Sequence, residues 1–303
     1  MVTKYGTEGT ELHGADALKK GGEITNCFSI DVEGFVESSL DSFHVDKEYI
    51  NPREENYEIE KNIDSILEFL NEFEIKGTFF FLGRIAEDLP GVVRKVSQNK
   101  HEIACHSYKH TRIFNINKDE FREQLRAAKL NLEDVSGSKV YGFRAPDFSI
   151  IESSRWALDI LKELGFEYDS SIFPVGMHDV YGIVNESRFI HRLENGLIEF
   201  PLSTVKIFNK TIPFGGGGYF RIYPVEITKL FISKINQLGY PCMFYIHPFE
   251  LGPVIPKVSN ISFYRKFRHY YHCKDGERRI KSIFKKFKFS AARDIINNYL
   301  LRV

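Results

Sequence analysis

Polar and charged side chains follow five short apolar runs of the sequence, at the point where each run ends. They are Asp31 and Glu33, His106, Arg144, Asp169 and His247. Short apolar runs such as 26–30 and 101–105 are typical of buried strands. The carboxyl ends of parallel strands meet on one face of a sheet or barrel, where active sites form. We therefore expect these side chains to share one site.

His106 and His110 are four residues apart. On a helical turn, both imidazoles would lie on one face and could hold one ion, although histidine pairs at this spacing also occur on exposed helices without a metal. Glu33 offers a carboxylate as a third ligand. Two imidazoles and one carboxylate leave coordination positions open for water and substrate. We predict a divalent metal bound by Glu33, His106 and His110, with Zn²⁺ preferred and Co²⁺, Ni²⁺ or Mn²⁺ able to replace it.

Hydrolysis at such a centre needs a base for the attacking water and an acid for the leaving group. Asp31 can lie beside the metal without binding it, and we predict that it is the base. His247 is the predicted acid, although a lone histidine at a strand end is more often structural. We expect Arg144 to pair with Asp31 and orient it. Asp169 is expected to orient His247 or keep it protonated.

Weaker candidates for contacts with the substrate or its oxyanion are Asp147, through its backbone amide, Ser170, Gly217 and Tyr219. The competing interpretation is that these residues are ordinary loop residues without contact to the substrate. The glycine run 215–218 lacks the ending of a phosphate-binding loop, and its sequence does not indicate a helix directly after it. We interpret the run as a loop with unusual dihedral angles that could let a substrate approach the backbone.

Strand and helix patterns alternate along the chain. Helical patterns cover 57–74, 84–100, 118–135, 153–164 and 224–238. The run 77–83 is apolar on both faces, as a strand buried between two layers must be. This alternation predicts a parallel sheet, either open or closed into a barrel.

The 303 residues carry 41 Lys and Arg and 41 Asp and Glu. This balance argues against a nucleic-acid-binding protein. The four cysteines show no spacing typical of a disulfide framework or a structural zinc site. We interpret 1–22 as a mobile leader without a secretory signal. Since no apolar run reaches the length of a membrane span, we expect a cytoplasmic protein. Its oligomeric state cannot be predicted.

The tail, 257–303, holds thirteen Lys or Arg residues and three acids. Its apolar residues Ile280, Ile283, Phe284 and Phe287 would share one stripe of a helix. Such a segment could lie on an anionic membrane surface, here the inner face of the membrane. It could also pack on the barrel, with its cations in solvent. We favour packing, because a half-apolar stripe is the rule for surface helices.

The sequences S-I-D-V-E, H-S-Y-K-H, R-A-P-D-F-S, Y-D-S-S and I-H-P-F-E occur in this order between about residues 25 and 250. Together they resemble the five motifs of the polysaccharide deacetylase family, which is carbohydrate esterase family 4, also called the NodB-homology family. The resemblance implies a distorted (β/α) barrel of parallel strands over 23–256, with 257–303 as a basic C-terminal helical extension packed on it. It also implies metal-dependent deacetylation of sugar polymers.

By position in these motifs, Asp31 is similar to the family's catalytic base and His106 and His110 to its metal ligands. Arg144 is similar to the arginine that orients the base, and His247 to the catalytic acid. The first motif departs from the common pattern of two adjacent acids, because Val32 separates Asp31 from Glu33. The carboxylate of Glu33 would reach the metal through a glutamate side chain, which is one methylene longer than that of an aspartate.

Three further stretches, 169–182, 213–221 and 263–271, resemble a subfamily found with exopolysaccharide gene sets. The implied function is removal of the acetyl group from an N-acetylated sugar in bacterial surface-polysaccharide assembly. The substrate would be a polysaccharide, an oligosaccharide or a lipid-linked precursor. Two alternatives are a metal-independent hydrolase of cyclic amides on the same scaffold, and a carbohydrate-binding protein whose catalytic site has lapsed.

Overall fold

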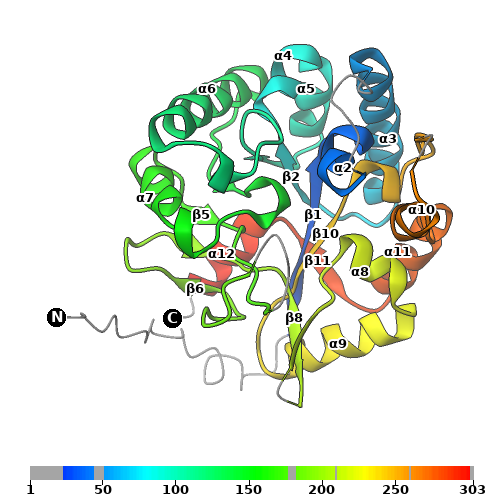
Figure 1. The fold of residues 1–303 in the computed structure, drawn as a ribbon. Coiled ribbons are helices and arrows are strands. Elements are labelled where there is room, and N and C mark those ends of the chain that lie inside the picture. The colour runs from blue at the N-terminus through cyan, green and yellow to red at the C-terminus, as the bar shows by residue number, and fades with distance from the viewer. Residues whose placement is uncertain (1–22, 44–50, 177–181, 209, 259–260, 301–303) are drawn as a thin grey trace.

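The computed structural model describes residues 23–300, apart from 44–50, 177–181, 209 and 259–260 (Figure 1). The predicted leader, 1–22, therefore lies outside the described residues. The same holds for 177–181, which belong to one of the stretches that resemble the exopolysaccharide subfamily.

A curled sheet of parallel strands forms the centre of the molecule (Figure 1). Its strands, in spatial order, are β10 (Met243–Ile246), β1 (Thr25–Val32), β2 (Thr78–Phe81), β3 (Glu102–Cys105), β4 (Gly142–Phe143), β5 (Tyr168–Asp169) and β7 (Ile198–Glu199). All of these neighbours pair in parallel. The short β6 (His191–Arg192) pairs antiparallel with β7 at the end of the sheet. The predicted distorted barrel of parallel strands is thus confirmed.

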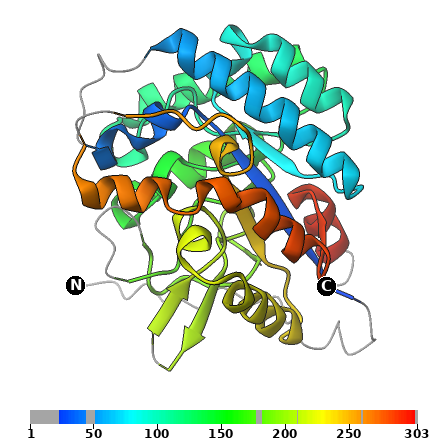
Figure 2. The same ribbon diagram turned by 90° about the vertical axis from the view of Figure 1, so that its right-hand side faces the viewer.

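Helices between these strands cover the outer face of the sheet (Figures 1 and 2). They are α3 (Pro52–Glu72), α4 (Gly83–Asp88), α5 (Pro90–Gln98), α6 (Lys118–Ser136), α7 (Trp156–Glu163) and α9 (Val225–Gln237). Their ends follow local rules. Asn117 caps α6 by accepting hydrogen bonds from two backbone amides, and Gly137 ends it at φ 65°. The expected apolar stripe of α3 is buried, with Ile59, Ile63 and Ile66 inaccessible to solvent.

The core lies between the sheet and these helices. Phe79, Phe80 and Phe81 are all fully buried, as a strand covered on both faces requires. The four cysteines are buried free thiols. They contribute as small apolar side chains.

The sequence patterns missed several short elements. They are α2 (Phe35–Phe43), the hairpin of β8 (Thr204–Ile207) and β9 (Lys210–Pro213), α8 (Gly217–Ile222) and β11 (Lys288–Ser290). The unusual dihedral angles predicted for 215–218 are confirmed at Gly216 (φ 138°) and Gly217 (φ 53°). The expectation that no helix directly follows is wrong, because α8 begins inside the glycine run. A helix of six residues is too short to show a periodic apolar pattern.

The C-terminal segment contains α10 (Phe263–Tyr270), α11 (Gly276–Phe284) and α12 (Ala292–Leu300), which lie along the outside of the barrel (Figure 2). Ile280 and Ile283 of the predicted stripe are each 1% exposed and therefore face the protein interior. Between α11 and α12, β11 pairs in parallel with β1. Within the described part of the chain, no helix combines the length and the hydropathy needed to cross a bilayer.

Candidate active site

The side chains predicted to meet do so at the carboxyl end of the sheet. Asp31 lies near the end of β1, with Glu33 just beyond it, and His106 directly follows β3. Arg144 directly follows β4, and His247 directly follows β10. Asp31, Glu33, His106 and Arg144 are at most 2% exposed. Parallel strands thus bring residues more than 200 positions apart to one mouth of the barrel.

Glu33 lies between two imidazoles. Its Oε2 atom is 3.2 Å from Nε2 of His106 and 2.8 Å from Nε2 of His110. The ligand atoms of these three residues all lie within 4.8 Å of one another. Nδ1 of His106 is 2.7 Å from the carbonyl oxygen of Arg144, to which it donates in the tautomer that leaves Nε2 able to bind a cation. This buried donor set fits a divalent metal such as Zn²⁺.

The local conformation around these histidines differs from the prediction. Residues 106–110 form a bend rather than a helical turn, and Ser107 has φ 72°. The ring centroids of His106 and His110 are nevertheless 5.8 Å apart. The i, i+4 helical argument was therefore wrong, because an irregular loop after β3 brings the two rings together.

The charges of this trio depend on one another. Burial raises the pKa of Glu33, but the charge of His110 and hydrogen bonds from three imidazoles outweigh it and hold that pKa well below its ordinary value. Burial lowers the pKa of His110, but the charge of Glu33 outweighs it and raises that pKa to about 10. The trio thus holds an ionised carboxylate beside a protonated imidazole, whose proton a divalent cation would have to displace.

Arg144 holds Asp31 in place. Its Nη1 atom donates to Oδ1 of Asp31 at 2.5 Å and to Oγ of Ser29 at 2.9 Å. Its Nη2 atom donates to Oγ of Ser170 at 3.0 Å, and its guanidinium lies 4.1 Å from the ring centroid of Phe80. The side chain is fully buried. With partners on several strands, Arg144 has one accessible position, and this orients the Asp31 carboxylate.

Ser170, a predicted substrate contact, has a side chain that is closed from solvent. It is fully buried, and its hydroxyl donates to the carbonyl oxygen of Phe200 at 2.8 Å while accepting from Arg144. Because its hydroxyl is buried and occupied in this way, Ser170 supports the arginine rather than the cleft.

His247 contacts both Glu33 and Glu250. Its Nε2 atom is 3.2 Å from Oε1 of Glu33, and its Nδ1 atom is 3.0 Å from Oε2 of Glu250. The same Oε2 atom accepts the backbone N–H of His247 at 2.9 Å. Burial lowers the pKa of His247, but the hydrogen bonds and charges of Glu250 and Glu33 outweigh it and raise the pKa to about 10. The geometry suits an imidazolium that can donate a proton.

The expectation that Asp169 orients His247 is wrong. Asp169 lies opposite Glu199 in the β5–β7 register and accepts a hydrogen bond from Ser171 at 2.5 Å. Burial raises the pKa of Asp169 to about 6, and burial together with the Asp169 charge raises the pKa of Glu199 well above its ordinary value. Side chains at facing register positions share a side of the sheet, so these two buried carboxyl groups are neighbours whose ionisations are coupled.

Glu250 orients His247 instead, and it is itself held by an arginine. Nε of Arg221 is 3.0 Å from Oε1 of Glu250. Nη1 of Arg221 donates to the carbonyl oxygen of His269 at 2.7 Å and contacts Sγ of Cys273 at 3.1 Å. Glu250 and Arg221 are 1% and 6% exposed. The position of Glu250, three residues after the predicted acid, was the available sequence signal.

Gly217 supports packing rather than substrate approach. It has φ 53°, and a Cβ atom there would lie 2.5 Å from Oη of Tyr245. Glycine is therefore required because α8 packs closely against β10. Tyr219, also predicted to contact substrate, is partly buried, with its ring centroid 6.3 Å from that of Phe173.

Asp147 lies in a strained turn, three residues after Arg144. Asp147 and Phe148 both have φ 51°, which is unusual for residues other than glycine. The Asp147 carboxylate accepts from Nε of Arg112 at 2.7 Å. Strain of this kind concentrates at functional sites, and the role of the Asp147 amide as an oxyanion donor stays a prediction.

Two buried acids that the sequence patterns did not single out hold the chain just beyond Glu33. Glu58 accepts the backbone N–H of Phe35 at 3.0 Å, and Glu55 accepts that of Val36 at 3.0 Å. A Cβ atom on Gly34 would lie 1.5 Å from Oε2 of Glu55. These contacts cap the start of α2. The sequence signal that could have identified these two acids was their position on the buried side of α3.

Comparisons with known proteins agree with this geometry. Residues 50–168 match the polysaccharide deacetylase family, and 170–297 match a domain of unknown function (DUF3473). A peptidoglycan-N-acetylglucosamine deacetylase of Bacillus cereus is 33% identical over 95 residues, 31% of this chain and 34% of that protein. A chitooligosaccharide deacetylase of Azorhizobium caulinodans is 31% identical over 83 residues, 27% of this chain and 40% of that protein. The matched segments thus span less than half the length of these relatives.

A solved structure from Mycobacterium smegmatis, described as a polysaccharide deacetylase, superposes with a TM-score of 0.62 at 21% identity and covers 93% of this chain and 92% of that chain. At this identity the likeness shows a shared fold. Residues 50–168 thus match the polysaccharide deacetylase family, and the ordered motifs and the parallel sheet agree with that match.

Proposed function

We propose that this protein is a metal-dependent deacetylase that hydrolyses the acetamide of an N-acetylated sugar. One observation carries the proposal: a buried Asp31–Arg144 pair, a Glu33–His106–His110 trio and the imidazole of His247 meet at one mouth of the barrel. Amide hydrolysis needs a base, an electrophile and an acid within reach of one bond. These three groups can supply them.

Glu33, His106 and His110 would hold the metal, with Zn²⁺ favoured by its preference for imidazole and carboxylate ligands. When bound, such an ion polarises the acetyl carbonyl and makes water more acidic. The hydrogen bond of His106 to the Arg144 carbonyl orients one ligand. Because Arg144 also binds Asp31, one residue couples the positions of ligand and base.

Asp31 would accept a proton from the attacking water while Arg144 keeps its carboxylate in one orientation. Nε2 of His247 would donate a proton to the amine nitrogen as the C–N bond breaks, with Glu250 holding Nδ1. The products are acetate and a free amino sugar. The backbone N–H of Asp147 would stabilise the developing oxyanion.

Two relatives that match this chain are named as deacetylases of peptidoglycan N-acetylglucosamine and of chitooligosaccharide. These names support an N-acetylhexosamine as the substrate unit. We propose that the substrate belongs to a bacterial surface polysaccharide, as a polymer, an oligosaccharide or a lipid-linked precursor.

Acetate release from chitooligosaccharides and other N-acetylated glycans tests the proposal. The full chain is freed of metal with a chelator and assayed alone and after addition of Zn²⁺, Co²⁺, Ni²⁺ or Mn²⁺. We expect acetate only with added metal. Activity of the metal-free protein on a cyclic amide would favour the metal-independent hydrolase, and glycan binding without acetate release would favour a carbohydrate-binding protein.

A further inference from the structure

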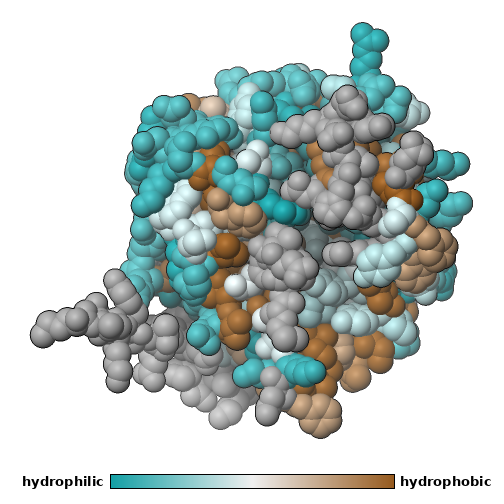
Figure 3. All heavy atoms as spheres, viewed as in Figure 1, coloured by the Kyte–Doolittle hydropathy of each residue, from teal (hydrophilic) through white to brown (hydrophobic). Residues whose placement is uncertain are grey.

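Among the described residues, a cluster of exposed large apolar side chains lies on α10. Phe263, Tyr264 and Phe267 are 85%, 72% and 49% exposed. Figure 3 shows hydrophobic surface at the right-hand edge of the molecule, where α10 lies in Figure 1. Neighbouring exposed rings on one short helix keep apolar surface in contact with water, which is unfavourable unless another surface covers them.

The inner side of α10 is anchored to the protein. The ring centroid of Tyr270 lies 5.2 Å from that of Phe35, and its hydroxyl donates to the carbonyl oxygen of Pro256 and accepts from the backbone N–H of Val258, both at 2.8 Å. The carbonyl oxygen of His269 accepts from Arg221. The helix is thus held from one side. The rings of Phe263 and Phe267 belong to its exposed side, where Phe267 contacts the ring of Tyr271 at a centroid distance of 4.6 Å.

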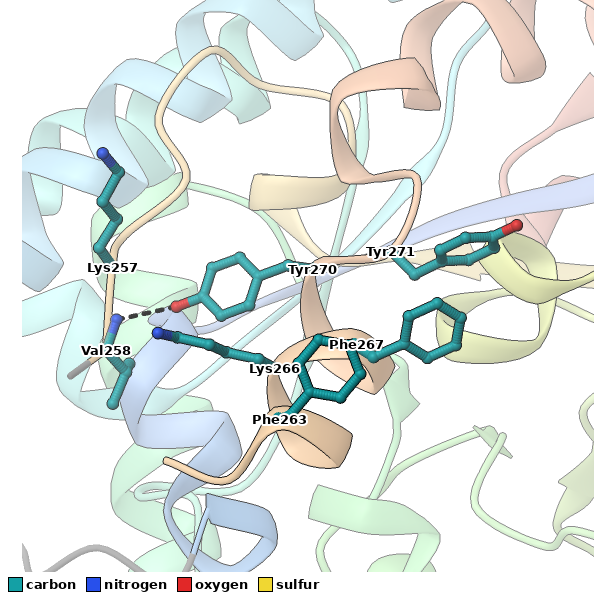
Figure 4. A pocket seen from close by; sticks show the side chains of 7 residues that line it. All are labelled: Lys257, Val258, Phe263, Lys266, Phe267, Tyr270 and Tyr271. Atoms are coloured by element: carbon teal, nitrogen blue, oxygen red, sulfur yellow. Dashed lines mark hydrogen bonds between the residues drawn. The ribbon is translucent and has the colours of Figure 1, made fainter. Parts of the chain in front are cut away.

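A cavity of about 600 Å³ lies between α10 and the preceding segment. Its lining is mostly apolar but includes two lysines: Lys257, Val258, Phe263, Lys266, Phe267, Tyr270 and Tyr271. Figure 4 shows Tyr270 and Lys266 pointing toward Val258. The surface therefore combines a recess between aromatic rings with ammonium groups at its edge.

The charged residues of the chain segment that carries this surface have one sign. Between Leu251 and Lys274 the sequence holds five Lys or Arg residues and no Asp or Glu. Lys257, Lys266 and Lys274 are exposed. Because the chain as a whole has a formal net charge of zero, this local excess is a feature of one segment rather than a general property.

We propose that this face, defined by α10 and Lys257, docks on an anionic lipid bilayer. Rings at the level of the headgroups and cations facing anionic lipids are the two interactions by which surface-bound helices attach to membranes. A polar glycan would lose hydrogen bonds with water against the mostly apolar lining. A bilayer removes the rings from water and places anionic headgroups beside the lysines.

The face lies beside the candidate active site. Ring contacts run from His247 to Phe249 with centroids 5.3 Å apart, from Phe249 to Phe35 at 4.6 Å, and from Phe35 to Tyr270 at 5.2 Å. Docking through α10 would bring the mouth of the barrel near the membrane surface. Vesicle binding is measured without substrate. The docking proposal can therefore fail or succeed independently of the proposed deacetylase activity.

Vesicle flotation of the full chain tests the proposal, with phosphatidylcholine vesicles compared with vesicles that also contain phosphatidylglycerol. We expect binding about tenfold tighter to the anionic vesicles, weakened by added salt. The double variant Phe263→Ser/Phe267→Ser should lose about tenfold in affinity, and Lys257→Glu/Lys266→Glu should lose at least as much.

Two matched controls use exposed residues elsewhere. Phe208 is 96% exposed on the β8–β9 hairpin, and Lys285 and Lys286 are exposed after α11. Phe208→Ser and Lys285→Glu/Lys286→Glu should leave vesicle binding unchanged. Membrane docking would be overturned if the controls lost as much affinity as the test variants, or if the unaltered protein did not bind vesicles. It would also be overturned if light scattering showed a dimer that Phe263→Ser/Phe267→Ser converts to monomers. That last result would identify a second copy of the chain as the partner.

Discussion

The two halves of the candidate active site are built differently. The base half, Asp31 with Arg144, is closed from solvent and braced by residues of several neighbouring strands. The acid half, His247 with Glu250 and Arg221, includes an imidazole whose side chain is 20% exposed. Its last support is the C-terminal segment, through the His269 carbonyl and Cys273.

The halves also fall on different parts of the chain. Arg144 lies in the segment that matches polysaccharide deacetylases, and Asp31 lies before it, outside both matched segments. His247, Glu250 and Arg221 lie in the segment that matches a domain of unknown function. Arg279 of α11 donates to the backbone carbonyls of Phe220 and Tyr223, on either side of the Arg221 segment. The second segment thus completes the site, and we expect losses at the acid half to be graded and those at the base half to be nearly complete.

The largest effect should come from Asp31→Asn, which keeps the shape of the side chain but removes the base. We expect kcat to fall by about 10³-fold, within the range for loss of general base catalysis. Acetate release measures it, and a thermal melt checks the fold. Asp169→Asn is the matched control, because that acid pairs with Glu199 away from His247. If both variants lose activity equally, the assignment of the base is wrong.

Glu33 links the two halves. It contacts His106, which is hydrogen-bonded to the Arg144 carbonyl oxygen, and it contacts His247. Glu33→Gln should weaken Zn²⁺ binding by about 100-fold, because an anionic ligand becomes a neutral amide. Calorimetric titration of Zn²⁺ into the chelator-treated protein measures this without substrate. An unchanged affinity would show that the metal, if bound, lies elsewhere.

Glu250→Gln tests the acid half. We expect kcat on an N-acetylated sugar to fall about 10- to 100-fold with little change in KM, because His247 loses its orienting charge. With 4-nitrophenyl acetate the deficit should shrink, since that leaving group departs without a proton. Glu199→Gln, a buried acid outside this half, is the control. A deficit of equal size on both substrates would indicate a structural role for Glu250.

The smallest predicted effect is on stability and concerns Glu58, which holds the chain just beyond Glu33. Burial raises the pKa of Glu58 to about 9, so the folded protein retains a proton that the unfolded chain releases above its ordinary pKa of 4.5. This contribution to stability is present at low pH and is lost as the pH rises from about 4.5 to 9. Relative to the unaltered protein, Glu58→Gln should therefore gain stability between pH 5 and pH 8.

The gain of Glu58→Gln should be on the order of 1–3 kcal/mol at pH 8. Urea unfolding over this pH range measures it. Glu60→Gln, an exposed position on the same helix, serves as the control and should show no such trend. A pH dependence identical to that of the unaltered protein would mean that Glu58 is ionised in the folded state.

The sequence determined the main strands and longer helices and the placement of functional residues at strand ends. These elements are predictable because the apolar pattern of a helix or strand is contained in a short stretch of sequence. The stripe of α3 and the uniformly apolar β2 are examples. Short elements such as α8, with six residues, lack enough periods to be recognised. The motif positions also placed Asp31, Arg144 and His247 in one site.

Tertiary structure alone decided which polar groups pair inside that site. Asp169 and Glu250 were both acids near predicted strand ends, but the β5–β7 register pairs Asp169 with Glu199, and the short turn after β10 brings Glu250 to His247. The contact of Arg221 with Cys273 joins residues 52 positions apart. Such contacts depend on how elements cross in space, and no local sequence pattern encodes that crossing.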